Sequence, residues 1–181
     1  MLGRLGAMRF ARTHRAATVA TAATTAAATA IIGAAAECRS LEGLIVRSGI
    51  EVYGRERNAP TRPDETAPLH PTSDYGRMLA GVEQTARELG RRVGFSVGKL
   101  RLAPVIGKHV PSPLGRLLRQ PMVPFSVLHD APFTVVHDSD AANAFVSAAA
   151  MRLDEPVNIV APGAITMSQA ILRGKRLPIP L

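Results

Sequence analysis

The sequence predicts an α/β fold in which short buried strands alternate with helices. Two observations carry this prediction. Short apolar runs recur along the second half of the chain, and the segment after the first run keeps the apolar spacing of an amphipathic helix. This alternation is typical of a parallel sheet covered by helices, rather than of a helical bundle or a β-sandwich. The length of 181 residues matches one such domain.

Residues 1–36 form an atypical segment in front of the α/β domain, which we place at residues 37–181. The segment has no acidic residue and holds 14 of the 29 alanines. Its four arginines are Arg4, Arg9, Arg12 and Arg15. The uncharged run Ala16–Ala36 is mainly Ala and Thr, too weakly apolar for a convincing membrane span. We expect an Ala-rich helix in a cytoplasmic protein. An Arg-rich targeting or export signal is the alternative.

The first strand is predicted at Leu44–Val46, an apolar run that ends in polar residues. Glu51–Pro71 is rich in Pro, Arg and Glu, which indicates a loop. A helix follows, because Thr72–Asp74 offers N-cap residues and the apolar positions of Tyr75–Leu89 recur at helical spacing. We expect Gly90 to end this helix.

The second half of the chain continues the alternation of strands and helices. The expected elements are a strand and turn over Phe95–Ile106, a basic helix or loop over Pro111–Pro124, a strand at Phe133–His137, an Ala-rich helix from Asp138 to about Met151, a strand at Val157–Val160 and a short helix at Thr166–Leu172.

Composition excludes several classes of protein and site. The single cysteine, Cys38, excludes an intramolecular disulfide framework and a cysteine-cluster zinc site. No metal site is expected at His129–Asp130 or His137–Asp138, because no short ligand spacing supports one. The net charge of +8 favours anionic partners. The basic stretch Leu89–His129 has too few aromatic residues for a nucleic-acid stacking surface, and a solvated face is its simplest interpretation.

Five segments, in order along the chain, together resemble a known family. They are Leu44–Gly54 (LIVRSGIEVYG), Tyr75–Arg77 with Val82–Glu83, Leu100–Gly107, Val136–Ala142, and Val157–Gly163 with Ser168–Ala170. These segments resemble the extended short-chain dehydrogenases/reductases, the NAD-dependent epimerase/dehydratase family that includes UDP-galactose 4-epimerase. The resemblance implies a doubly wound, Rossmann-like NAD(P)-binding fold, present here as its central and carboxyl-side part.

The resemblance also implies a function. Members of this family use NAD or NADP to epimerise or dehydrate nucleotide sugars, with isomerase as the expected class, and a tyrosine deprotonates a sugar hydroxyl while hydride passes to the nicotinamide. On this chain the implied catalytic residue is Tyr75, with Ser48 as a weaker hydroxyl candidate. Arg116 and Arg119 are the candidates for binding the sugar diphosphate, and the region of Pro104 for binding the cofactor.

Three departures from the family pattern bear on activity. Gly49 stands where the family has Ser or Thr, and Leu79 stands where it has the lysine that stabilises the tyrosine phenolate. The Gly-rich phosphate turn is not visible, since only Met1 and Leu2 precede Gly3. NAD or NADP binding by this chain is therefore doubtful, and we expect weak or no activity. Arg47 is an alternative cation, although nothing in the sequence places it near Tyr75.

Two alternatives stay open at this stage. First, Tyr75 could equally be a packing residue whose hydroxyl contacts water. Second, the whole chain could be a non-catalytic remnant, or a binding or regulatory partner of another polypeptide. A truncated reading frame would also explain the missing turn. Because a neighbour for one side of the Leu44–Val46 strand is not found, we expect an unpaired sheet edge that promotes self-association.

Overall fold

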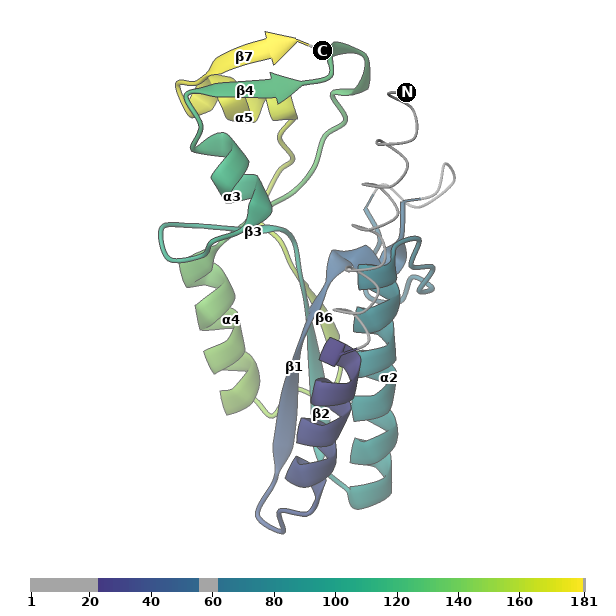
Figure 1. Cartoon of the computed structure of the whole chain (residues 1–181). Coiled ribbons are helices and arrows are strands. Elements are labelled where there is room, and N and C mark those ends of the chain that lie inside the picture. The colour runs from purple at the N-terminus through teal and green to yellow at the C-terminus, as the bar shows by residue number, and fades with distance from the viewer. Residues whose placement is uncertain (1–22, 56–61, 181) are drawn as a thin grey trace.

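The computed structural model describes residues 23–55 and 62–180 and confirms an α/β fold with parallel strands (Figure 1). The central sheet has the order β1-β2-β6, all parallel, with β1 at Gly43–Gly49, β2 at Ser96–Leu102 and β6 at Pro156–Ile159. The helix of residues 23–36 and helix α2 (Asp74–Val93) cover one face, and α4 (Asp138–Ala150) covers the other.

A smaller lobe lies beyond the carboxyl ends of β1 and β2, at the top of Figure 1. It begins with β3 (Val105–Ile106), which pairs in parallel with β5 (Val136–His137). Its outer part is a second parallel pair, β4 (Met122–Phe125) with β7 (Leu177–Pro180), beside α3 (Pro113–Leu118) and α5 (Met167–Arg173). Two 3-10 turns complete the fold, η1 at Ile50–Tyr53 and η2 at Val127–His129.

Alternation along β2 divides the apolar core between the two faces of the sheet. Leu100 and Leu102 lie in a cluster on the α4 side with Val136, Ala141 and Ala148. Val97 lies in a second cluster, on the α2 side, with Ile32, Val46, Ala86 and Phe95. Ile32 is 5% exposed, so the helix of residues 23–36 is part of this core.

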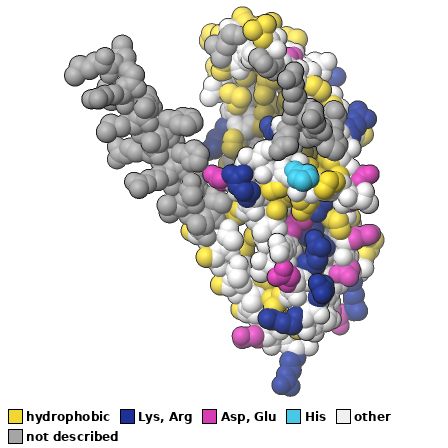
Figure 2. All heavy atoms as spheres, turned by 90° about the vertical axis from the view of Figure 1, so that its right-hand side faces the viewer, with side chains coloured by type: hydrophobic (Ala, Val, Ile, Leu, Met, Phe, Trp, Pro, Cys, Tyr) yellow, Lys and Arg dark blue, Asp and Glu magenta, His cyan; other side chains and the backbone are white. Residues whose placement is uncertain are grey.

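Helix α2 begins as the sequence predicts. Ser73 is its N-cap, and the hydroxyl oxygen of Ser73 accepts a hydrogen bond from the N–H of Gly76 at 3.0 Å. The solvent-facing side of this region carries basic and acidic side chains intermixed (Figure 2).

The end of α2 differs from the prediction. The helix continues past Gly90 to Val93 and ends at Gly94, whose φ of 95° is the left-handed conformation that glycine adopts readily. Gly90 is needed for a different reason. A Cβ there would lie 2.5 Å from Cγ2 of Val97 and 2.8 Å from the carbonyl oxygen of Phe95. Gly90 therefore permits close packing of the helix on β2.

Other element predictions also change in detail. The Pro111–Pro124 region holds α3 and then β4, and neither β4 nor β7 was expected, because both contain proline. Proline is tolerated in edge strands, and in a two-stranded sheet both strands are edges. The strand expected at Phe133–His137 is only Val136–His137, while Phe133 makes an isolated bridge with Ile165.

The amino-terminal helix is observed over residues 23–36. Residues 16–22 of the predicted helix, and the four arginines before them, lie outside the described residues, and the division at residue 36 stays a prediction. In the part of the chain that the structure describes, no helix is long and apolar enough to cross a membrane.

A buried polar network joins the sheet to the α2 layer. Nε and one terminal nitrogen of Arg101 on β2 donate to the two carboxylate oxygens of Glu83 on α2, at 3.0 and 2.8 Å. The other terminal nitrogen donates to the Tyr53 hydroxyl at 2.7 Å, and that hydroxyl donates to Oδ1 of Asn158 at 2.9 Å. Burial by itself would lower the pKa of Arg101, but the hydrogen bonds to Glu83 and Tyr53 raise it.

This network corrects the interpretation of the basic stretch as a solvated face. Arg101 is 4% exposed and Lys99 is 6% exposed, so two of its seven cations are inside the protein. The network also holds the loop before α2: the N–H of Asn158 donates to a carboxylate oxygen of Glu65 at 2.7 Å, and the Asn158 side chain donates to the carbonyl of Pro63 at 3.1 Å.

We predict that Glu83→Gln lowers the free energy of unfolding by about 3–5 kcal/mol, because it leaves the Arg101 charge buried without its counter-ion. Urea denaturation would measure the loss. The double variant Glu83→Leu/Arg101→Met should be less destabilised than Glu83→Gln, since it buries no unpaired charge.

The matched control is the exposed Asp74–Arg77 ion pair at the start of α2. Arg77→Met should change the free energy of unfolding by less than about 1 kcal/mol. Equal losses in the buried and the exposed variants would contradict the role assigned to the Arg101–Glu83 pair.

Candidate functional site

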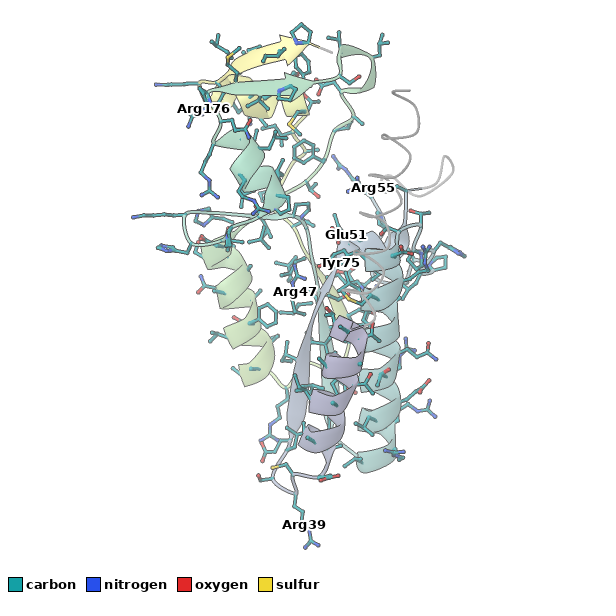
Figure 3. All side chains as sticks on the ribbon, in the orientation of Figure 1. Arg39, Arg47, Glu51, Arg55, Tyr75 and Arg176 are labelled. Atoms are coloured by element: carbon teal, nitrogen blue, oxygen red, sulfur yellow. The ribbon has the colours of Figure 1, made fainter. Side chains whose placement is uncertain are left out.

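The candidate site lies at the carboxyl edge of the sheet. β1 pairs with β2 so that Gly49 lies beside Leu102, and both strands therefore end at the same level. In open α/β sheets, ligands bind at this edge. Arg47, Glu51 and Tyr75 gather here, where β1 ends and α2 begins (Figure 3).

Tyr75 stands in the first turn of α2, one residue after Asp74, and is 39% exposed. A terminal nitrogen of Arg47 on β1 donates a hydrogen bond to the Tyr75 hydroxyl oxygen at 2.5 Å. The Ser73 cap fixes where α2 starts, and so brings the phenol of Tyr75 to the end of β1. The structure thus joins two residues that the sequence did not place together.

Gly49 and Leu79, the two departures from the family pattern, face each other. A Cβ built on Gly49 would lie 3.2 Å from Cδ1 of Leu79. It would also lie 2.3 Å from Oε2 of Glu51, so the Glu51 carboxylate occupies the space that a side chain at position 49 would take. Leu79 is 4% exposed and packs against Val52 and Tyr53.

Ser48 and Pro104 lie near the same edge but differ in access. Ser48 has no exposed surface, and its hydroxyl has no hydrogen-bond partner among the described residues. Pro104 follows β2 directly, and its carbonyl accepts a hydrogen bond from the N–H of Val136 at 3.2 Å. Its backbone therefore connects the sheet to the smaller lobe.

Arg116 and Arg119 lie in the smaller lobe, at α3, and both are exposed. Ser112 caps α3 by accepting a hydrogen bond from the N–H of Gly115. No hydrogen bond or ion pair among the described residues joins either arginine to Arg47, Glu51 or Tyr75. The structure leaves their binding role a prediction.

The resulting arrangement is an exposed phenol with a cation on its oxygen and a carboxylate near by. A phenol can donate or accept a proton, and a guanidinium stays charged at any physiological pH. Sequence reasoning did not single out Glu51. The available signal was its charge in the otherwise apolar stretch Gly49–Tyr53. Within the described residues, no group of three or more His, Cys, Asp or Glu side chains is arranged to hold a metal ion.

Comparison with known proteins decides the family. Residues 6–159 match the model of the NAD dependent epimerase/dehydratase family. The chain belongs to this family. Uncharacterised proteins of Mycobacterium bovis and Mycobacterium tuberculosis are each 32% identical to it over 154 residues, which is 83% of this chain and 41% of theirs.

Solved structures show the same fold at lower identity. UDP-N-acetylglucosamine 4-epimerase from Bacillus cereus superposes with a TM-score of 0.73 at 18% identity, over 85% of this chain and 58% of that one. MoeE5, solved with UDP-glucose and NAD, also superposes with a TM-score of 0.73, at 22% identity, over 86% of this chain and 56% of its own. The chain thus spans less than two thirds of the length of these proteins.

We predict that Leu79→Lys lowers the free energy of unfolding by about 2–4 kcal/mol, because an ammonium would replace a buried apolar side chain packed on Val52 and Tyr53. Leu79→Met, which conserves volume, should cost less than about 1.5 kcal/mol. Thermal and urea unfolding would measure both. A Leu79→Lys variant as stable as Leu79→Met would show that position 79 accepts the lysine of the family pattern.

Proposed function

We propose that this chain is an epimerase/dehydratase-family protein related to nucleotide-sugar epimerases, with weak or no turnover as the chain stands. The observation that carries the proposal is the surroundings of Tyr75. Its phenol is exposed at the carboxyl edge of the sheet and is held by Arg47, while the residue one turn later is the buried Leu79. The proton-transferring group is present, but the ammonium of the family pattern is replaced.

Family membership, and the UDP-glucose and NAD bound by MoeE5, support the proposed substrate class and cofactor. A nucleotide sugar such as UDP-glucose is the proposed substrate, and NAD or NADP the proposed cofactor, which would accept and return hydride. The described residues do not fit a dinucleotide by themselves, since they include no Gly-rich turn from a strand into a helix that could hold a pyrophosphate.

Tyr75 is the group proposed to exchange a proton with a sugar hydroxyl. Arg47 keeps the phenol oxygen in place by donating a hydrogen bond to it. Glu51 is the proposed hydrogen-bond acceptor for a substrate hydroxyl, since its carboxylate lies beside Gly49 at the same edge of the sheet. Neither residue supplies the cofactor site that hydride transfer needs.

We predict that the purified chain binds NAD(H) and NADP(H) with a dissociation constant of about 1 mM or weaker, a binding free energy of only about 4 kcal/mol. The reason is that no described turn approaches a pyrophosphate closely. Isothermal titration calorimetry would measure it, and a low-micromolar constant would refute the proposal of weak activity.

The control restores the two family residues together. Gly49→Ser/Leu79→Lys, assayed at a temperature where circular dichroism shows it folded, should show no turnover of UDP-glucose with NAD, because correct proton-transfer groups cannot act where the hydride carrier is not held. Cofactor-dependent turnover by this double variant would mean that the cofactor site is complete and that only these two side chains limit the rate.

A second candidate function is that of a non-catalytic partner of another polypeptide or of a second copy of this chain. The observation in its favour is the edge of the central sheet. Among the described residues, β1 pairs with β2 alone, so its other side presents backbone N–H and C=O groups without strand partners. Such an edge is a template for association.

We predict that the chain self-associates at micromolar concentration despite its net charge of +8. Sedimentation velocity over a concentration series, at moderate salt, would detect a rising average mass. A chain that stays monomeric throughout the series would contradict the open-edge interpretation.

A further inference from the structure

A cavity of about 730 Å³ lies on the α2 side of the sheet, away from the carboxyl edge. Its walls are the second half of α2, the beginning of β2, the start of β6 and the loop at residues 65–69. This volume is in the range of small-molecule sites. Neither Tyr75 nor Arg47 lines it, so it is separate from the candidate site described above.

Lys99 is the unusual residue of this cavity. Its side chain lines the cavity although the residue is only 6% exposed, and it makes no hydrogen bond or ion pair with any described residue. Burial lowers the pKa of Lys99 and the positive charge of Arg87 lowers it further, while the carboxylates of Glu83 and Asp154 act in the opposite direction.

Side chains of both signs line the cavity around Lys99, with cations in excess. Arg87 and Arg91 add two more cations from α2, while Arg101 is already paired with Glu83. Two carboxylates also line the cavity, and both have backbone partners: Asp154 accepts from the N–H of Val97 at 2.7 Å, and Glu65 from the N–H of Asn158.

The remaining wall is apolar. Ala67, Leu69, Phe95 and Val97 line the cavity beside the cations. A ligand that fits must therefore carry a compact anionic group for Lys99 and the two arginines, together with a body that covers apolar surface. A phosphate monoester has these properties, because its dianion can bind an ammonium and a guanidinium at the same time.

We propose that this cavity binds a small phosphorylated molecule, with Lys99 as the buried contact to the phosphate and Arg87 as a second cation at its mouth. The site is independent of the Tyr75 edge and of the proposed function. Its occupancy would place an anion beside an ammonium that is otherwise unpaired. An anion of this kind would also link α2 to β2 through charge, next to the Arg101–Glu83 pair.

Titration of the full chain with phenyl phosphate, followed by isothermal calorimetry, tests the proposal. Saturable binding is expected, weakened at least about tenfold by Lys99→Met, which removes the buried charge. Lys175→Met is the matched control, because it removes the same charge from an exposed position outside the cavity. It should change the dissociation constant by less than about twofold.

A second cavity variant and a second ligand complete the experiment. If Lys99→Met does not fold, Arg87→Met replaces it at an exposed helix position, and binding should weaken at least about threefold. Benzoate, which carries one charge on the same ring, should bind at least about tenfold more weakly than phenyl phosphate. Absence of saturable binding to the wild-type chain, equal binding by both cavity variants and the wild type, or equal binding of benzoate would each overturn the proposal.

Discussion

The hydrogen-bonded pair of Arg101 and Glu83 is the interaction on which the arrangement of this protein depends. Two opposite charges buried at 4% and 1% exposure are tolerated only in one relative position, so they fix the height of α2 along β2. Tyr53 extends the constraint to η1, since its hydroxyl binds both Arg101 and Asn158. Because η1 follows β1 directly, the same network sets where the end of β1 meets the start of α2.

The candidate site inherits its geometry from that network. Leu79 packs against Val52 and Tyr53, and its Cδ1 atom lies next to Gly49. A packing cluster therefore occupies positions 49 and 79, where the resemblance to the family predicts two polar catalytic side chains. In this chain Gly49 and Leu79, near Tyr75, are part of the apolar packing. Arg47 on β1 is the residue that contacts the Tyr75 hydroxyl.

Local pattern was enough to predict β1, α2, α4 and an N-cap within Thr72–Asp74, because strong apolar periodicity and capping residues act within a few positions. It was not enough for β4 and β7, whose prolines argue against strands until their pairing is known. Arg101 was counted in a basic stretch, since only tertiary structure supplies Glu83 as its partner. The contact between Arg47 and Tyr75 was likewise beyond reach, as 28 residues separate them.

The exclusively parallel pairing of the described strands has a consequence for how the chain folds. Gly43 pairs with Ser96, Lys99 with Pro156 and Met122 with Leu177, so none of these pairings is a local hairpin. Each requires closure of a long loop before any strand contact forms, and proteins dominated by such contacts fold slowly. During synthesis, β2 is made well before its partner β6, and β4 well before its partner β7. The apolar surface of β2 and β4 is exposed until those partners have been synthesised. Prompt cover by a chaperone would benefit this topology more than a helical bundle of equal length.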